Sequence, residues 1–157
     1  MTFNTSILLL LFSANFFWAG VNTTFYNALY SDSLETIESA LEQLDREKLS
    51  TTVEAYKGGL TMKKSNYMKS AAKKIATFKA GGKLLESAIQ SAPNNAEYRF
   101  IRLTIQEHAP KILKYNKNIE EDKVLILKGY KKMDSKTRAY VLDYAKQSDI
   151  LSAKDFK

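Results

Sequence analysis

The chain has 157 residues, of which 45% are hydrophobic, so it is long enough for one domain with a hydrophobic core. It contains no cysteine, which excludes a disulfide scaffold, a thiolate zinc site, a cysteine nucleophile and a lipid-modified N-terminal cysteine. Lys and Arg outnumber Asp and Glu by 24 to 17, which gives a net charge of +7. This charge could attract an anionic partner, but an ordinary solubility charge is the favoured interpretation.

The composition predicts an all-α fold. The chain has only two prolines and six glycines, and no stretch alternates regularly between polar and apolar residues. Frequent Ala, Leu, Lys and Glu favour helices. We expect one domain of five or six helices in antiparallel hairpins over residues 21–147. A C-terminal tail, residues 148–157, is expected to be frayed or loosely docked.

The first twenty residues carry no charge and contain an apolar core at residues 7–12. This pattern predicts a secretory signal peptide at residues 1–20, although its start lacks Lys and Arg and Phe17 or Trp18 would lie at the cleavage position. An uncleaved anchor and a buried helix are the alternatives. With the signal removed, the mature chain is expected to be exported, periplasmic or secreted, and to lack a transmembrane span.

Apolar spacing and capping residues place the remaining elements. Capping boxes are predicted at Asp32 with Glu35 and at Thr51 with Glu54. Ile112, Leu113 and Tyr115 are expected to pack inward from a short turn or helical fragment at residues 111–117. The expected elements are a helical piece at 21–30 and helices at about 32–46, 51–64, 71–91, 96–108, 118–133 and 134–147.

Two glycine pairs lie inside predicted helices, Gly58-Gly59 and Gly81-Gly82. A glycine inside a helix costs around 1 kcal/mol relative to alanine. We therefore expect a compensating gain in packing, most simply a close approach between the two helices.

The helix at 96–108 is apolar over a broad arc, with Arg99, Arg102 and Gln106 in a narrow polar stripe. The two guanidiniums could grip a carboxylate or phosphate in a groove. They could instead pair internally with Glu121 or Asp122, which we favour because buried guanidiniums need partners. Our hypothesis for a binding groove adds two tyrosines, Tyr98 and Tyr115.

Between Lys57 and Lys83 there are eight lysines and no acid. A basic surface could bind an anionic glycolipid or polymer, and a solvated face is the simpler interpretation. We expect no nucleic-acid partner, because exposed aromatic residues do not alternate with the lysines. The surface would be carried by Lys63, Lys64, Lys73 and Lys74.

No catalytic or metal-binding motif is present, so we predict no enzyme activity and no cofactor. His108 is the only histidine and is interpreted as structural. The acids Glu120, Glu121 and Asp122 lack the spacing of a calcium loop and are expected to stabilise the start of a helix. A small hydrolase of unknown type is the least favoured alternative.

Gly81, Leu85, Ala88 and Pro93 match positions of a tetratricopeptide repeat's second helix, so the segment resembles that architecture. The stretch AYKGGLTMKKS, followed by LLESAIQSAPNNAEYRFIRLTIQEHAPKIL, resembles an uncharacterised family of exported helical proteins of Bacteroidota. The resemblance implies an all-helical fold in the cell envelope. The expected role is a non-enzymatic adaptor for a protein or peptide, with anionic glycolipid or polymer as the alternative ligand.

Overall fold

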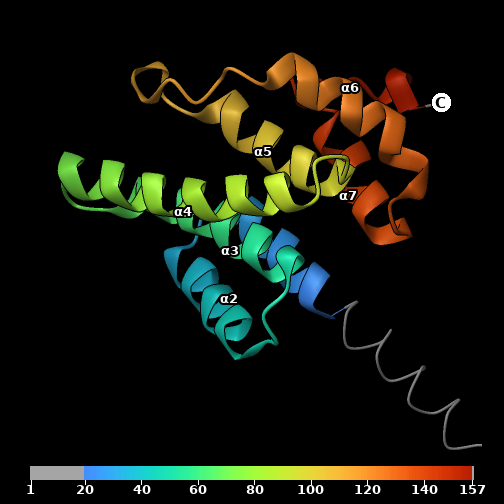
Figure 1. The fold of residues 1–157 in the computed structure, drawn as a ribbon. Helices are drawn as coiled ribbons and strands as arrows, with labels where there is room; N and C mark the ends of the chain where they lie inside the picture. Colours follow the sequence, from blue (N-terminus) through green and yellow to red (C-terminus); the bar gives the residue numbers. More distant parts are fainter. Residues whose placement is uncertain (1–19, 157) are drawn as a thin grey trace, which may run out of the picture.

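The computed structural model describes residues 20–156, and this part of the chain is all-helical and contains no strand (Figure 1). The predicted fold class is confirmed at that level. Residues 20–30 form the first helix and bring the described α-helices to seven, where five or six were expected. The others are α2 (Leu34–Arg46), α3 (Thr51–Lys64), α4 (Ala71–Ser91), α5 (Ala96–His108), α6 (Ile119–Gly129) and α7 (Ser135–Tyr144).

Short polar side chains begin most of these helices, by accepting a hydrogen bond from a free backbone N–H in the first turn. Ser33 caps α2 and Ser50 caps α3, so the predicted capping boxes at Asp32 and Thr51 were wrong by one residue. The caps of α4, α5 and α7 are Ser70, Asn95 and Asp134.

Helices α3 and α4 form an antiparallel hairpin whose contact depends on glycine (Figure 1). A Cβ on Gly58 would lie 2.6 Å from the backbone nitrogen of Leu85, and one on Gly81 would lie 2.6 Å from that of Met62. Side chains at either position would overlap the opposite backbone. The predicted close approach is therefore confirmed, and Gly58 and Gly81 are the residues that allow it.

Helix α5 lies in the middle of the fold, between the α3/α4 hairpin and α6 (Figure 1). Nine of its thirteen residues are buried, as its broad apolar arc predicted. On the other side of the core, the helix at residues 20–30 buries Phe25, whose ring stacks on Tyr56 of α3 at 3.9 Å. This N-terminal helix therefore packs directly against α3.

Of the two expectations for the C-terminal tail, frayed or loosely docked, the structure shows docking onto the domain. Leu151 is 2% exposed, and Phe156 packs on Tyr130 with 4.6 Å between ring centres. The carboxylate of Glu107, on α5, accepts hydrogen bonds from the backbone N–H of Asp149 at 2.6 Å and from the hydroxyl of Ser148. These contacts hold the tail against α5 and against the turn that follows α6.

Two further expectations were wrong in the segment between α5 and α6. Ile112 is 85% exposed instead of packing inward, whereas Leu113 and Tyr115 are partly buried. Helix α6 ends at Gly129, short of the expected end near residue 133, and a 3-10 turn (Tyr130–Lys132) follows it.

Within residues 20–156, no helix is both long enough and apolar enough to cross a bilayer. The predicted signal peptide, residues 1–20, lies outside the described residues apart from Gly20.

Candidate functional site

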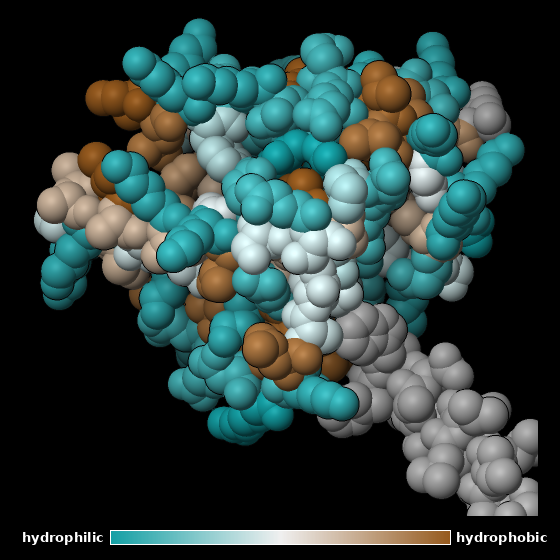
Figure 2. Space-filling model, viewed as in Figure 1, coloured by the Kyte–Doolittle hydropathy of each residue, from teal (hydrophilic) through white to brown (hydrophobic). Residues whose placement is uncertain are grey.

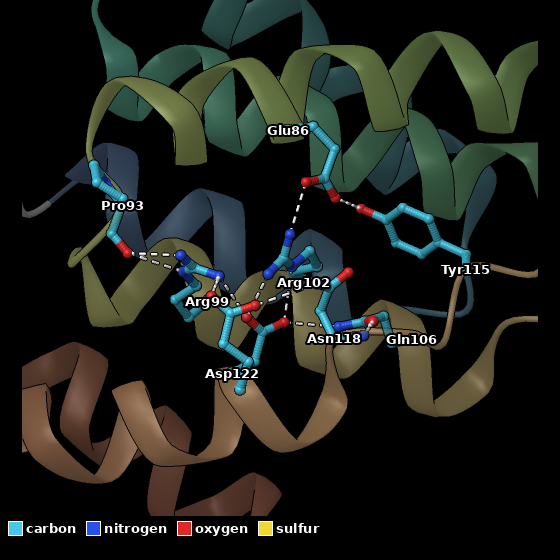
Figure 3. Close-up of polar contacts among 9 residues, drawn as sticks. Glu86, Pro93, Arg99, Arg102, Gln106, Tyr115, Asn118 and Asp122 are labelled. Carbon is cyan, nitrogen blue, oxygen red and sulfur yellow. Dashed lines mark hydrogen bonds and ion pairs between the residues drawn. The ribbon is translucent and has the colours of Figure 1, made fainter.

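The polar stripe of α5 is buried against the start of α6, where Asp122 is its central partner (Figure 3). Arg102 donates to both carboxylate oxygens of Asp122, from Nε at 2.8 Å and from Nη2 at 2.6 Å. Its Nη1 donates to Glu86 of α4 at 2.7 Å. Burial alone would lower the pKa of Arg102, but the hydrogen bonds and charges of Asp122 and Glu86 outweigh it and raise that pKa.

The other two stripe residues complete the same network. Arg99 donates from Nη1 to Asp122 at 3.1 Å and also binds the carbonyl oxygen of Pro93 at 2.8 Å. Gln106 donates to Asp122 at 2.7 Å and accepts from the backbone N–H of Asn118 at 3.0 Å (Figure 3). Arg99, Arg102, Gln106 and Asp122 are all buried, and the most exposed of them, Arg99, is 6% exposed. The stripe thus connects α4, α5 and α6 through buried hydrogen bonds and ion pairs.

The residues proposed to line a groove are therefore not gathered around an open site. Tyr98 is buried elsewhere, with its hydroxyl 2.6 Å from that of Thr52 on α3. Tyr115 donates to Glu86 at 2.6 Å, so it shares a partner with Arg102 but belongs to the network. Of the two alternatives stated for the arginines, the contacts correspond to internal pairing.

The three acids at the start of α6 have different positions. Asp122 is fully buried, while Glu120 and Glu121 are exposed. Glu121 accepts a hydrogen bond from Arg99 at 3.0 Å and another from Asn118. In residues 20–156, no group of three acids or histidines is arranged to hold a metal ion.

The four lysines of the proposed basic surface have different surroundings and do not form one surface. Lys64 pairs with Glu38 of the acidic α2 face at 2.8 Å. Lys63 is half-buried at the edge of a cleft, whereas Lys73 and Lys74 are exposed in the first turn of α4. Only the last two lie on an open surface.

A cleft of about 350 Å³ opens between the ends of four helices, namely the helix at residues 20–30, α3, α5 and α7. Its volume is near the lower end of the range for ligand pockets. Its walls mix apolar and polar groups. The lining residues are Leu29, Tyr30, Asp32, Met62, Lys63, Asn66, Phe78, Thr104, Ile105, His108, Ala109, Pro110, Tyr144 and Gln147.

Lys63 gives this cleft a positive charge that is not engaged in a direct ion pair within the described residues, although Asp32 lines the same cleft. Burial lowers the pKa of Lys63, and the charge of Asp32 opposes that change. Among residues 20–156, no carboxylate forms an ion pair with its ammonium group, in contrast to Lys57 and Lys64 on the same helix. The cleft therefore offers a partly desolvated cation beside apolar surface.

His108 and two tyrosines form the polar side of the cleft. The Nδ1–H of His108 donates to the carbonyl oxygen of Thr104 at 3.0 Å, which leaves Nε2 as its second polar atom. Tyr144 donates to Glu107 at 2.6 Å and lies 3.4 Å from Nδ1 of His108. The hydroxyl of Tyr30 is buried without a hydrogen-bond partner among the described residues. His108 itself is exposed.

A second polar cluster surrounds Glu97, in the first turn of α5. Oε1 of Glu97 accepts hydrogen bonds from the hydroxyls of Tyr56 at 2.7 Å and Tyr26 at 3.1 Å, and from Nδ2 of Asn22 at 3.3 Å. Burial raises the pKa of Glu97, and the tyrosine hydrogen bonds oppose that rise only in part. Burial and the nearby charge of Glu97 likewise raise the pKa of Tyr56.

We expect Glu97→Gln to remove a pH dependence of stability. Because burial raises the folded-state pKa above the unfolded value, the folded protein binds the proton first as the pH falls. The parent's free energy of unfolding should therefore rise relative to that of the variant as the pH falls from the raised pKa to the ordinary value of 4.5, and stay level below it. Urea unfolding of both proteins across this range measures the difference. A difference that does not change with pH would contradict the burial-driven shift.

Sequence reasoning missed the cleft because its lining comes from segments far apart in the chain. Lys63 had been placed on an outer surface, and Tyr144 and Gln147 had no role. In the sequence, the one feature that pointed to the cleft was a histidine at the end of an apolar helix, followed by Ala109-Pro110. Comparison of the chain with protein-family models, curated proteins and solved structures gave no significant match.

Proposed function

We propose that the protein is an exported, non-enzymatic binding protein of the cell envelope that receives a carboxylate-bearing segment of a peptide or protein partner in the cleft beside Lys63. The observation that carries this proposal is the half-buried ammonium group of Lys63, which has no ion pair within residues 20–156. A partly desolvated cation binds a carboxylate more strongly than a fully solvated one.

The shape and composition of the cleft support a peptide-sized ligand. Its volume of about 350 Å³ suits one or two side chains rather than a large cofactor. Met62, Phe78 and Ile105 supply apolar wall, while Asn66 and His108 add polar groups at exposed positions. We infer a ligand with an apolar side chain adjacent to a carboxylate, such as an acidic or C-terminal residue of an extended chain.

Binding rather than catalysis fits the groups around the cleft. His108 has Thr104 and Tyr144 as polar neighbours, and Tyr144 is already engaged with Glu107. The hydroxyl of Tyr144, at 3.4 Å from Nδ1 of His108, donates its proton to Glu107 instead of to the imidazole, unlike a base-activated nucleophile. The tetratricopeptide-like interpretation belongs to this proposal, because helical hairpins of that kind are used to bind extended peptides.

A panel of short peptides with free or amidated C-termini tests the site. We expect the parent to prefer free carboxylates adjoining an apolar residue. Lys63→Met should weaken their binding about tenfold or more, since a hydrogen bond to a charged group contributes roughly 1.5–3 kcal/mol. Affinities can be measured by fluorescence anisotropy of labelled peptides.

The matched control is Lys64→Met, which removes the neighbouring charge outside the cleft. This variant should bind the peptides as the parent does. Equal weakening by both substitutions, or a parent that retains no peptide of the panel, would overturn the proposed site.

A further inference from the structure

At one end of the molecule, the start of α4 lies near the segment between α5 and α6 (Figure 1). The rings of Phe78 and Tyr115 meet there edge to face, with 5.4 Å between their centres. We call this region the basic end and define it as residues 69–75 together with residues 111–117. Tyr115 connects this end to the network around Asp122 through Glu86, but the exposed lysines of the basic end carry a different chemistry.

The start of α4 extends beyond its neighbours. Residues 71–76 are all exposed, and Phe78 is the first buried residue of the helix. The first turn contains Lys73 and Lys74 and no acid, although the helix dipole favours negative charge at this position. Stabilisation of the helix therefore does not account for these lysines.

The basic end carries positive charge that the fold leaves unpaired. No Asp or Glu occurs in residues 55–85 or in residues 108–119. Elsewhere the described lysines include four that form ion pairs with acids. None of the lysines of the basic end forms an ion pair within residues 20–156. They are Lys69, Lys73, Lys74, Lys111, Lys114 and Lys117.

Two isoleucines project among these lysines. Ile75 is 41% exposed and Ile112 is 85% exposed, and both are among the four large exposed hydrophobic residues of the described chain. Figure 2 shows apolar surface interspersed with hydrophilic side chains at the end where α4 begins. The turn that carries Ile112 ends at Lys114, which has a φ of 50° and is the single non-glycine residue with positive φ in residues 20–156.

We propose that the basic end docks the protein on the surface of a bilayer containing anionic phospholipid. Clustered lysines are attracted to anionic headgroups, and exposed aliphatic side chains beside them enter the boundary between headgroups and acyl chains. A nucleic acid or another hydrophilic polyanion would explain the lysines but would leave the isoleucines without a role. The exposed aromatic rings that a single-stranded nucleic acid stacks on are also lacking, because Tyr115 is partly buried and bonded to Glu86.

The test measures binding of the full chain to vesicles of phosphatidylcholine alone and of phosphatidylcholine mixed equally with phosphatidylglycerol. Residues 1–19 carry no charge, so their contribution should be similar for both compositions. The ratio of the two affinities therefore reports the basic end. The parent should prefer the anionic vesicles, and raising the salt concentration should reduce that preference.

Charge variants locate the surface. Replacing Lys73 and Lys74 by Gln should lower the affinity ratio about tenfold or more, because each lysine near an anionic surface contributes about fivefold. Replacing Lys131 and Lys132, two exposed lysines of the turn after α6, should change the ratio by less than about twofold. If both pairs of substitutions lowered the affinity ratio equally, net charge alone would drive binding. This result would overturn the proposal.

An apolar variant separates a bilayer from a hydrophilic polyanion. Ile112→Ser should weaken binding to the anionic vesicles at least about threefold, whereas Val124→Ser, at another exposed apolar residue, should not. Both positions are exposed, so neither change should affect folding, which circular dichroism can verify. Docking by the basic end would be refuted if replacing Lys73 and Lys74 left vesicle binding unchanged. It would also be refuted if the parent and the Ile112→Ser variant bound the anionic vesicles equally well.

Discussion

Asp122→Asn should destabilise the protein by about 3 kcal/mol or more, because it removes the negative charge that two buried guanidiniums share. Asp122 is fully buried and accepts hydrogen bonds from Arg99, Arg102 and Gln106. Asparagine has nearly the same shape, so the cost would come from charge and hydrogen bonding instead of a cavity. Urea unfolding followed by circular dichroism measures the change in the free energy of unfolding.

Glu121→Gln is the matched control for this variant. Glu121 also pairs with Arg99 and also lies in the first turn of α6, so both substitutions remove one acid from the same helix end. Its side chain is 53% exposed, and we expect a cost below about 1 kcal/mol. A similarly small cost for Asp122→Asn would show that the network does not hold α5 to α6, and the arginines would again be candidates for ligand binding.

Gly81→Ala and Gly82→Ala should have opposite effects although the two residues are neighbours. A Cβ on Gly81 would lie 2.6 Å from a backbone nitrogen of α3, so α3 and α4 would have to separate. We expect a loss of roughly 2 kcal/mol, within the range for overpacking. A Cβ on Gly82 would meet only the end of the Met62 side chain, at 3.6 Å, and alanine should gain up to about 1 kcal/mol from helix propensity.

A double-mutant cycle tests the cause of this difference. Gly58 faces Gly81 across the hairpin, so alanine at either position would force the same separation. The variant with both alanines should therefore lose less stability than the sum of the single variants. Additive losses would show that the two glycines act independently, and equal effects of Gly81→Ala and Gly82→Ala would contradict the close approach itself.

The periodic part of the fold could be predicted from the sequence because the pattern there is local. The bounds of α3, α4 and α5 match the expected helices at 51–64, 71–91 and 96–108. Asn95 caps α5 shortly after Pro93, so the start of this helix also follows from local sequence. The glycine pairs correctly indicated a close contact because an unpacked glycine would only cost stability.

The candidate site could be predicted only in part, because it depends on which buried faces meet. The sequence showed that Arg99 and Arg102 needed acidic partners, and it named Glu121 and Asp122. It could not show that Glu86 joins the network, because the crossing of α4 over α5 decides that contact. Ile112 was expected inside, since hydrophobicity alone does not distinguish a core residue from one at an exposed turn.

The hydrogen bond from Asn22 to the hydroxyl of Thr137, at 3.0 Å, joins the first described helix to α7 across 115 residues of sequence. In an open repeat array each unit contacts only its neighbours, so folding can begin anywhere and spread along the chain. Here the two ends of the described chain must meet before the core around Tyr56 and Glu97 is complete. Long-range closure of this kind slows folding and makes the helices gain and lose their structure together.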